Sequence, residues 1–281
     1  MSIVVAQTRG ELEALREPRR ITAVVMTMGA LHAGHAELIR EARLVVGPSG
    51  RVIVTDFVNP TQFGPTEDFA RYPRTLDADV ALSEAAGADI VFAPSVQEVH
   101  GDAERAAITV DPGPLGTILE GASRPGHFAG VLSVVAKLLH LTSPDIAFFG
   151  EKDYQQLVLI SQMVDDLRFP VTVLPVATVR EPDGLAMSSR NRYLTSEERA
   201  LAPVLSQALM AAAIDAELQG AASAEAVGRA LLDRPGVVVD YLVVTDVELG
   251  PARPGPGRVL GAIRIGGTRL IDNMSCQVVA P

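Results

Sequence analysis

The sequence has almost no cysteine and no tryptophan. Cys276 is the single cysteine among 281 residues, which excludes a disulfide framework and a multi-cysteine metal site. No uninterrupted apolar run is long enough to span a bilayer. The N-terminus lacks the basic region and the long apolar stretch of a signal peptide. We therefore expect a cytoplasmic protein without a membrane anchor.

Positive charge is also scarce. The chain has 24 Lys and Arg against 34 Asp and Glu, a net charge of −10. Nucleic acids and anionic membranes need a cationic surface, so we expect neither as a partner, although a few placed cations can still bind an anionic substrate. Lys137 and Lys152 are the only lysines, which draws attention to any motif that contains one. A composition of 48% hydrophobic and 21% charged residues is ordinary for a globular protein of about two domains.

Common nucleotide and hydrolase motifs are missing. The chain contains no G-x-x-x-x-G-K-[ST] phosphate loop, no G-x-S-x-G elbow and no G-x-G-x-x-G fingerprint. Any nucleotide site must therefore be built from other residues.

Strand-like and helix-like segments alternate through the first two thirds of the chain. The expected strands are 21–28, 52–58, 89–93, 146–149 and 171–174, and the expected helices are 35–46, 76–86, 127–141 and 153–167. This rhythm predicts an α/β fold with a doubly wound, Rossmann-like parallel sheet. Ligands of such sheets bind outside the carboxyl ends of the strands.

The pattern changes after about residue 180. Thr195-Ser196-Glu197-Glu198 fits a capping box that opens an alanine-rich helix to about residue 218. A helix over 224–232 and three β-type runs follow, at 237–244, 258–265 and 268–271, with a Pro/Gly-rich loop at 251–257. We expect residues 1–180 to form the Rossmann-like domain and 181–281 a smaller α+β domain.

The strongest local signal is the segment Met26-Thr27-Met28-Gly29-Ala30-Leu31-His32-Ala33-Gly34-His35, which leaves the first strand and enters the first helix. Two glycines permit close backbone approach, and free N–H groups at a helix N-terminus favour a phosphate. His32 and His35 lie on one side of that turn and can donate to phosphate oxygens as neutral imidazoles. The alternative, in which both only cap and pack the helix, carries equal weight. A zinc site is weaker, because no third ligand has motif spacing.

A second strand-to-helix segment is Phe148-Phe149-Gly150-Glu151-Lys152-Asp153-Tyr154-Gln155-Gln156. Gly150 lets the chain turn, Lys152 can reach a phosphate, and Gln156 lies one turn further along the same side. Asp153 is well explained as a helix cap. Lys152 as a mere surface lysine is the alternative, and the scarcity of lysine in this chain disfavours it.

Two polar loops complete the set. Met187-Ser188-Ser189-Arg190-Asn191 is a compact group of donors suited to a triphosphate, although alone it is typical of a solvated loop. Phe57-Val58-Asn59-Pro60-Thr61-Gln62-Phe63 follows a strand, and Asn59 and Gln62 can bind the hydroxyl and carboxylate groups of a small substrate. Asn59-Pro60 is also a simple turn former.

These four segments, in this order and spacing, resemble the pantothenate synthetase family of the HxGH nucleotidyltransferase superfamily. The similarity extends to Arg269-Leu270-Ile271-Asp272-Asn273 and so covers nearly the whole chain. It implies an ATP-dependent ligase that condenses pantoate with β-alanine through a pantoyl adenylate, releasing AMP and pyrophosphate. It also implies Mg²⁺ accompanying ATP, a homodimer, and a second domain that closes over the site.

The resemblance also implies roles for individual residues. His35 is the implied proton donor, with His32, Lys152, Ser188, Ser189 and Arg190 as further catalytic groups. Gln62, Gln156 and Asn59 would bind pantoate, with Gln62 also close to β-alanine. The residues implied to line the ATP site are Met28, Gly29, Ala30, Leu31, His32, Ala33, Gly34, His35, Gly150, Glu151, Lys152, Asp153, Val179, Met187, Ser188, Ser189 and Arg190.

Three positions depart from the family pattern. Met26 stands where a proline is usual, Asp56 is unusual at the end of a buried strand, and Ala129 replaces a larger polar residue. Asp79 and Asp153 are candidate outer-shell partners of Mg²⁺. Two other functions stay open: another HxGH-type nucleotidylyltransferase, and a nucleotide-binding regulator that has lost catalysis.

Overall fold

The structure is a computed structural model that describes residues 2–17, 19–64, 69–101 and 108–280. The chain forms two compact units, which we describe one at a time. The first comprises Met1–Gly150 and Leu159–Val176, and the second comprises Glu151–Val158 and Ala177–Pro281. A single cut in the chain does not separate them, since the segment Glu151–Val158 belongs with the C-terminal residues.

The first unit is built on a six-stranded parallel sheet. Its strands are β1 (Val4–Ala6), β2 (Thr22–Thr27), β3 (Arg51–Asp56), β4 (Ile90–Phe92), β5 (Ile146–Gly150) and β6 (Thr172–Val176). Their order is β1-β4-β3-β2-β5-β6, and every neighbouring pair is parallel. The predicted doubly wound fold is confirmed. The order reverses between β2 and β5, and such a switch point is where open α/β sheets bind ligands.

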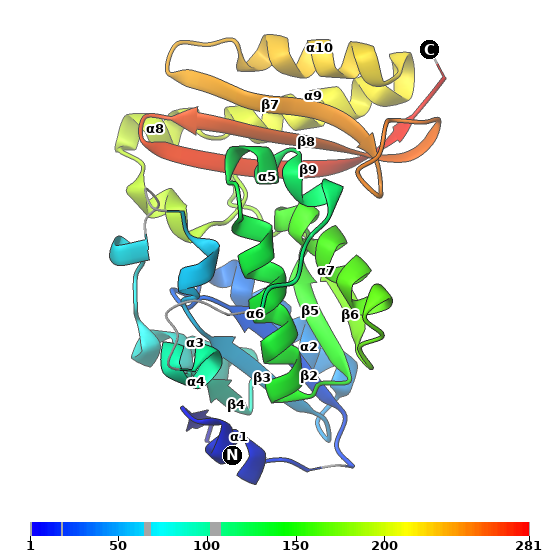
Figure 1. The fold of residues 1–281 in the computed structure, drawn as a ribbon. Coiled ribbons are helices and arrows are strands. Elements are labelled where there is room, and N and C mark those ends of the chain that lie inside the picture. Colours follow the sequence, from blue (N-terminus) through cyan, green and yellow to red (C-terminus); the bar gives the residue numbers. More distant parts are fainter. Residues whose placement is uncertain (1, 18, 65–68, 102–107, 281) are drawn as a thin grey trace. The chain divides into compact units, whose positions relative to one another are not determined.

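Helices cover both faces of this sheet. The helices in this part of the chain are α1 (Arg9–Ala14), α2 (Ala33–Val46), α3 (Leu76–Ala86), α4 (Val96–His100), α5 (Glu120–Ser123), α6 (His127–Thr142) and α7 (Tyr154–Asp166), with 3₁₀ turns η1 (Pro60–Gln62), η2 (Phe69–Arg71) and η3 (Pro114–Thr117). Only the part of α7 from Leu159 onward belongs to the first unit. α2 and α3 pack on one face and α6 lies over the other (Figure 1). Val25, Val54 and Ile39 are fully buried between sheet and α2, as expected for strands covered on both sides.

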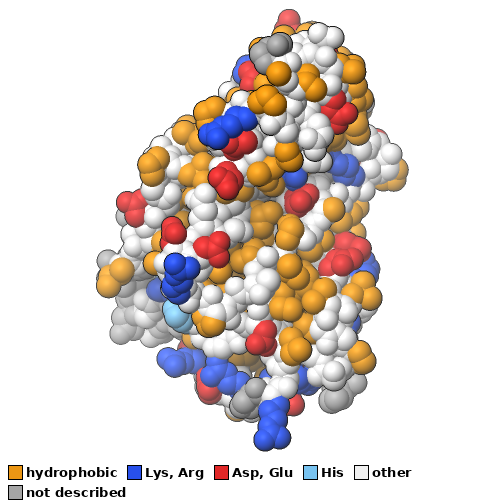
Figure 2. Space-filling model, turned by 90° about the vertical axis from the view of Figure 1, so that its right-hand side faces the viewer, with side chains coloured by type: hydrophobic (Ala, Val, Ile, Leu, Met, Phe, Trp, Pro, Cys, Tyr) orange, Lys and Arg blue, Asp and Glu red, His pale blue; other side chains and the backbone are white. Residues whose placement is uncertain are grey.

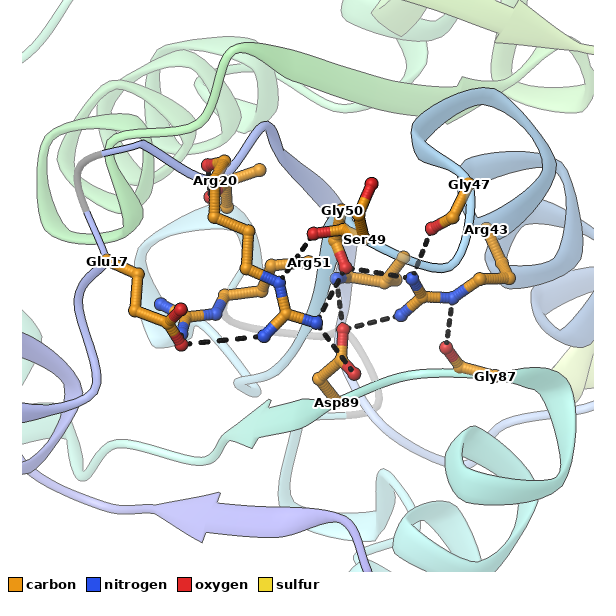
Figure 3. Close-up of polar contacts among 11 residues, drawn as sticks. Glu17, Arg20, Arg43, Gly47, Ser49, Gly50, Arg51, Gly87 and Asp89 are labelled. Carbon is orange, nitrogen blue, oxygen red and sulfur yellow. Dashed lines mark hydrogen bonds and ion pairs between the residues drawn. The ribbon is translucent and has the colours of Figure 1, made fainter. Parts of the chain in front are cut away.

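An arginine network joins the amino ends of the central strands (Figure 3). Arg43 donates to the Gly87 carbonyl at 3.0 Å and pairs with Asp89 at 2.5 Å, while Arg20 lies 3.7 Å from the same carboxylate. Asp89 also accepts the N–H of Val52 at 2.8 Å. These contacts hold the starts of β3 and β4 together at the edge opposite to the loops that follow the strands.

The second unit is a three-stranded antiparallel sheet with helices on one side (Figure 1). Its elements are η4 (Glu151–Asp153), η5 (Ser189–Tyr193), α8 (Ser196–Leu201), α9 (Val204–Gln219), α10 (Ala221–Leu232), β7 (Val237–Asp246), β8 (Gly255–Ile265) and β9 (Thr268–Val278). Leu209, Leu242 and Ile263 are fully buried in its core. Gly228 lets α10 lie close to β7, because a Cβ there would come within 2.7 Å of Leu242.

Several element boundaries differ from the sequence prediction. β9 does not end at residue 271 but continues to Val278, because its polar residues alternate with buried ones. β8 begins at Gly255, inside the segment 251–257 that was expected to be a loop. The alanine-rich helix is two helices, α8 and α9, because Pro203 has no N–H to continue the helical ladder. The Thr195 capping box is confirmed. The prediction missed β1, α1, α4 and α5, which are only 3–6 residues long.

One described stretch, Ser196–Gln219, is long and apolar enough to cross a membrane by length and composition. Of the 18 consecutive residues in it that meet this test, 56% are buried inside the protein. Leu205, Leu209 and Ala212 of α9 pack in the core of the second unit, so the apolar character of the stretch is explained by that core.

Acidic and basic side chains are mixed with apolar ones on the face drawn in Figure 2. The excess of 34 acidic over 24 basic side chains is therefore not gathered into a patch of one sign on that face.

Candidate active site

The candidate residues of the first unit follow three adjacent strands. The histidine loop, residues 28–35, follows β2, the Asn59–Gln62 turn follows β3, and Gly150 ends β5. β2 pairs in register with both β3 and β5, so the carboxyl ends of all three lie side by side. This places the loops at the switch point of the sheet.

The histidine loop turns through two consecutive left-handed residues, Gly29 with φ 76° and Ala30 with φ 51°. That conformation costs an alanine about 1–2 kcal/mol. Asp79 of α3 stabilises it by accepting the N–H of Ala30 at 2.9 Å and that of Leu31 at 2.7 Å. Thr75 donates its hydroxyl to the same carboxylate at 3.0 Å.

These contacts correct the expectation of free N–H groups in this loop. The Ala30 and Leu31 amides are already bonded to Asp79, because a buried amide needs an acceptor inside the protein. Asp79, which the sequence offered as an outer-shell partner of Mg²⁺, is 2% exposed and binds the backbone of this loop.

The two histidines cap helix α2 and stack on each other. His32 Nδ1 accepts the N–H of Gly34 at 3.1 Å, and His35 Nδ1 accepts the N–H of His32 at 3.3 Å. Their ring centroids are 4.1 Å apart. With Nδ1 as acceptor, a neutral imidazole carries its proton on Nε2. In the neutral form each ring therefore uses Nδ1 for the helix and carries its proton on Nε2.

A second carboxyl group lies under the same loop. Asp56, at the end of β3, hydrogen-bonds Asp79, and a Cβ at Gly29 would collide with its carboxyl. Burial, followed by the charge and hydrogen bond of Asp79, raises the pKa of Asp56 to about 7. The pair therefore shares a proton below that pH, with Asp56 as donor. The unusual Asp56 of the sequence is thus part of the support of the histidine loop.

Gln62 and Asn59 lie together beside the histidine loop. Asn59 Nδ2 donates to Gln62 Oε1 at 3.1 Å, and Gln62 Nε2 donates to Met28 Sδ at 2.9 Å. The His127 ring contacts the backbone carbonyl of Gln62 at 2.8 Å. Both residues are buried, since Asn59 is 1% exposed and Gln62 is 8% exposed. The first unit therefore brings two buried side-chain amides into contact with the loop expected to bind ATP.

In the second unit, the turn that carries Lys152 is held by strands β8 and β9. Asn273 donates from Nδ2 to the carbonyls of Glu151 at 2.8 Å and Lys152 at 2.9 Å. Arg258 bonds Asn273 at 2.7 Å and Glu151 at 2.9 Å, and stacks over the Tyr154 ring at 4.0 Å. With its backbone held, Lys152 carries a partly exposed ammonium 3.6 Å from Asp153.

The loop with the two serines is held by the neighbouring residue of β9. Arg180 makes a bidentate pair with Asp272 at 2.6 and 3.0 Å, and an antiparallel bridge joins Arg180 to Ala186. This brings Val179 beside Met187, whose N–H donates to the Val179 carbonyl at 3.0 Å.

Ser188 then opens the η5 turn. Its hydroxyl accepts the N–H of Arg190 at 3.3 Å, and Ser189 is the first residue of that turn. Asn191 closes the loop by donating to Glu181 at 3.0 Å and to the Ala186 carbonyl at 3.1 Å. Ser188, Ser189 and Arg190 are all partly exposed.

The predicted residues thus form two groups. Those of the first unit are Met28, Gly29, Ala30, Leu31, His32, Ala33, Gly34, His35, Asn59, Gln62 and Gly150, and those of the second are Glu151, Lys152, Asp153, Gln156, Val179, Met187, Ser188, Ser189 and Arg190. Gln156 is the third residue of α7 and is partly exposed.

Sequence reasoning missed the residues that hold these groups in place. Lys137 was noticed for its rarity but given no role, and His100, Asp272 and Asn273 were given none. A buried histidine near the end of a short helix gives no local signal, since its partners come from distant segments. Asp272 and Asn273 had one signal, because they belong to the last segment of the family resemblance.

Comparison with known proteins decides the family. A family model described as pantoate-beta-alanine ligase matches residues 3–275. The chain belongs to that family. The resemblance inferred from the four sequence segments is confirmed.

Relatives of high similarity cover nearly the whole chain. It is 55% identical over 276 residues to a pantothenate synthetase of Salinispora arenicola (strain CNS-205), a match that covers 96% of each chain. It is 53% identical to a pantothenate synthetase of Mycobacterium sp. (strain KMS), covering 97% of this chain and 90% of the relative.

Solved structures agree in fold. The pantothenate synthetase of Thermus thermophilus superposes with a TM-score of 0.91 at 46% identity, covering 99% of this chain and all of the other. The pantoate-beta-alanine ligase of Francisella tularensis, solved with a β,γ-ATP compound and β-alanine, has a TM-score of 0.80 at 33% identity and 97% coverage of both chains. The α/β fold with a small C-terminal antiparallel sheet is that of the family.

Proposed function

We propose that this chain, an ATP-dependent ligase of pantoate and β-alanine, works in two steps through a pantoyl adenylate. In the first step, a pantoate carboxylate oxygen attacks the α-phosphorus of ATP. The bond from that phosphorus to the bridging oxygen breaks, and pyrophosphate leaves. In the second step, the β-alanine amine attacks the activated carbonyl carbon, and the carbon–oxygen bond to AMP breaks. Pantothenate and AMP are the products.

One observation in the first unit supports this scheme above the others. The Gln62 amide contacts Met28, the first residue of the histidine loop, at 2.9 Å. A nucleotide held by this loop and a small acid held by Gln62 would therefore be neighbours. In-line transfer between two bound substrates depends on this kind of positioning and on charge stabilisation.

The proposed catalytic groups stabilise the charge that develops on the phosphates. His35 is the proton donor through Nε2, and His32 donates in parallel. Lys152 supplies a point charge, and Ser188, Ser189 and Arg190 supply hydroxyl and guanidinium donors. The remaining ATP contacts would come from the backbone and side chains of residues 28–34, 150, 151, 153, 179 and 187.

Pantoate and β-alanine are assigned to Gln62 and Gln156. The side-chain amide of Asn59 bonds to protein groups with both its nitrogen and its oxygen, so Asn59 contributes through Gln62. We propose that the second unit closes over these substrates, and that the enzyme is a cytoplasmic homodimer.

Mg²⁺ is assigned to the ATP phosphates. Among the described residues, no group of three or more His, Cys, Asp or Glu side chains is arranged to hold a metal ion. This fits Mg²⁺, which in such sites is bound mainly by substrate phosphates and water with one or two carboxylates. Asp153 is the carboxylate beside Lys152 that could serve as an outer partner. When bound, the ion would neutralise phosphate charge.

Exchange of labelled pyrophosphate into ATP tests the proposal. We expect exchange that requires pantoate and occurs without β-alanine, because the first step is reversible and complete in itself. Exchange that needs no pantoate, or that needs a different acid, would indicate another nucleotidylyltransferase. Binding of ATP without any exchange would indicate a regulator.

A further inference from the structure

Gln62 is the last member of a hydrogen-bonded chain that begins at a lysine. Lys137 of α6 donates from Nζ to His100 Nδ1 at 3.0 Å and to the Val99 carbonyl at 3.1 Å. His100 Nε2 contacts Asn59 Oδ1 at 2.9 Å. Asn59 Nδ2 in turn donates to Gln62 Oε1 at 3.1 Å. Three segments distant in sequence are joined in this way.

The lysine sets the tautomer of the His100 ring, which then acts on Asn59 together with the Thr61 N–H, 3.3 Å from Asn59 Oδ1, and the Gly130 carbonyl, 3.3 Å from Asn59 Nδ2. An ammonium can only donate, so His100 Nδ1 must accept and its ring proton must lie on Nε2. Nε2–H then donates to Asn59 Oδ1, which also accepts the hydroxyl of Thr61 at 2.9 Å. The amide nitrogen of Asn59 is therefore turned toward Gln62.

The consequence is a fixed orientation of the Gln62 amide. Its oxygen accepts from Asn59, so its NH₂ group faces Met28 and the histidine loop. An NH₂ group donates, and a donor is what binds a carboxylate or hydroxyl oxygen. With the opposite orientation, the amide oxygen would face a substrate carboxylate and repel it.

We propose that Lys137 and His100 are positioning residues, which orient Asn59 and Gln62 so that Gln62 presents a donor to the carboxylate or hydroxyl oxygens of pantoate. This inference rests on the proposed function, because it takes Gln62 as a pantoate contact.

The electrostatic surroundings of His100 support the neutral ring that this chain needs. Burial and the charge of Lys137 lower the pKa of His100. Lys137 is the charged group that acts on it from α6, while Asn59 and Phe57 face it from the chain after β3 without charge. A second proton on His100 would place an N–H against the ammonium and break the chain at that bond.

Steady-state kinetics of the full-length enzyme test the proposal. For Lys137→Met and His100→Phe we expect a rise of about tenfold in the KM for pantoate, the effect of one misoriented hydrogen bond. We expect kcat and the KM for ATP to stay within about twofold, because no contact with ATP changes. Lys137→Arg, which keeps a cationic donor, should recover most of the affinity. His140→Phe is the control, since this histidine is exposed on the same helix.

The pH profile separates positioning from a purely structural role. As the pH falls below 6.5, the ordinary pKa of a histidine, we expect the wild-type KM for pantoate to rise as His100 gains a proton, because burial and Lys137 hold its pKa below that value. His100→Gln, whose amide can accept from Lys137 and donate to Asn59 but does not titrate, should flatten that rise. An unchanged pH profile in His100→Gln, or an equal rise in both KM values in Lys137→Met, would overturn the inference. Wild-type turnover that does not depend on pantoate would instead overturn the proposed function.

Discussion

In the first unit, two carboxyl groups packed against the histidine loop stabilise it, whereas in the second unit adjacent residues of strand β9 stabilise two separate loops. Asp79 accepts backbone N–H groups and shares a proton with Asp56. Asp272 and Asn273 of β9 instead bind an arginine and two backbone carbonyls. The carboxyl pair of the first unit contains a group that titrates near neutral pH. The contacts in the second unit are an ion pair and hydrogen bonds donated by a side-chain amide. The two groups of site residues should therefore respond differently to pH and to mutation.

The largest effects should come from one catalytic group in each unit. His35→Ala and Lys152→Ala should each lower the rate of pantoate-dependent pyrophosphate exchange by roughly 10²–10³-fold, the cost of losing one oriented donor. Exchange assays at saturating ATP and pantoate would measure this. Arg40→Ala, an exposed cation on α2 paired with Glu37, is the control and should change the rate little. Near-normal exchange in either variant would remove that residue from the proposed machinery.

The next effect concerns the support in the second unit. Asp272→Ala leaves Arg180 without its bidentate partner and should lower the free energy of unfolding by about 1.5–3 kcal/mol. Arg264→Ala, which removes an exposed pair with Asp240, should cost less than about 1 kcal/mol. Urea denaturation of both variants measures the difference. Equal losses would show that the buried pair is no stronger than the exposed one.

In the first unit, the contribution of Asp56 to the free energy of unfolding should depend on pH. The pKa of Asp56 is about 7 in the folded chain against 3.8 for an ordinary carboxyl, so the folded state binds the proton more tightly. Its contribution to stability is complete below pH 3.8 and is lost as the pH rises through about 7. Within this window Asp56 lowers stability by up to about 1.4 kcal/mol per pH unit.

Asp56→Asn should remove that contribution, because an amide also donates to Asp79 but does not titrate. Unfolding free energies of wild type and variant, measured from about pH 5 to pH 8, should therefore converge toward low pH and diverge toward high pH. Asp77→Asn, on the exposed side of α3, is the control and should keep the wild-type slope. Parallel curves for wild type and Asp56→Asn would show that Asp56 does not share a proton in the folded chain.

The smallest effects should come from the helix N-caps, because each unit contains a threonine cap of the same kind. Thr8 and Thr195 both form capping boxes, at the starts of α1 and α8. Thr8→Ala and Thr195→Ala should each cost about 1 kcal/mol of stability, and the serine variants almost nothing. Calorimetry measures the change in stability. It also shows whether both alanine variants shift one shared unfolding transition or each shifts the transition of its own unit. Alanine variants as stable as wild type would contradict the capping contribution.

Local patterns determined much of this protein. The alternation of apolar strands and amphipathic helices predicted the parallel sheet, because strands buried on both faces need a recognisable apolar run. The Thr195 capping box and the four family segments could be recognised because each depends on residues that are neighbours in the chain. The family followed from those segments together.

Tertiary structure alone decided how the site residues are held. The contacts from Asp79 to the Ala30 and Leu31 amides, from Lys137 to His100, and from Asn273 to the turn at Lys152 span between 37 and 122 positions in sequence. No local spacing encodes such contacts. They arise because parallel strands bring their carboxyl ends to one edge, and because buried amides and charged groups must find partners wherever the fold places them.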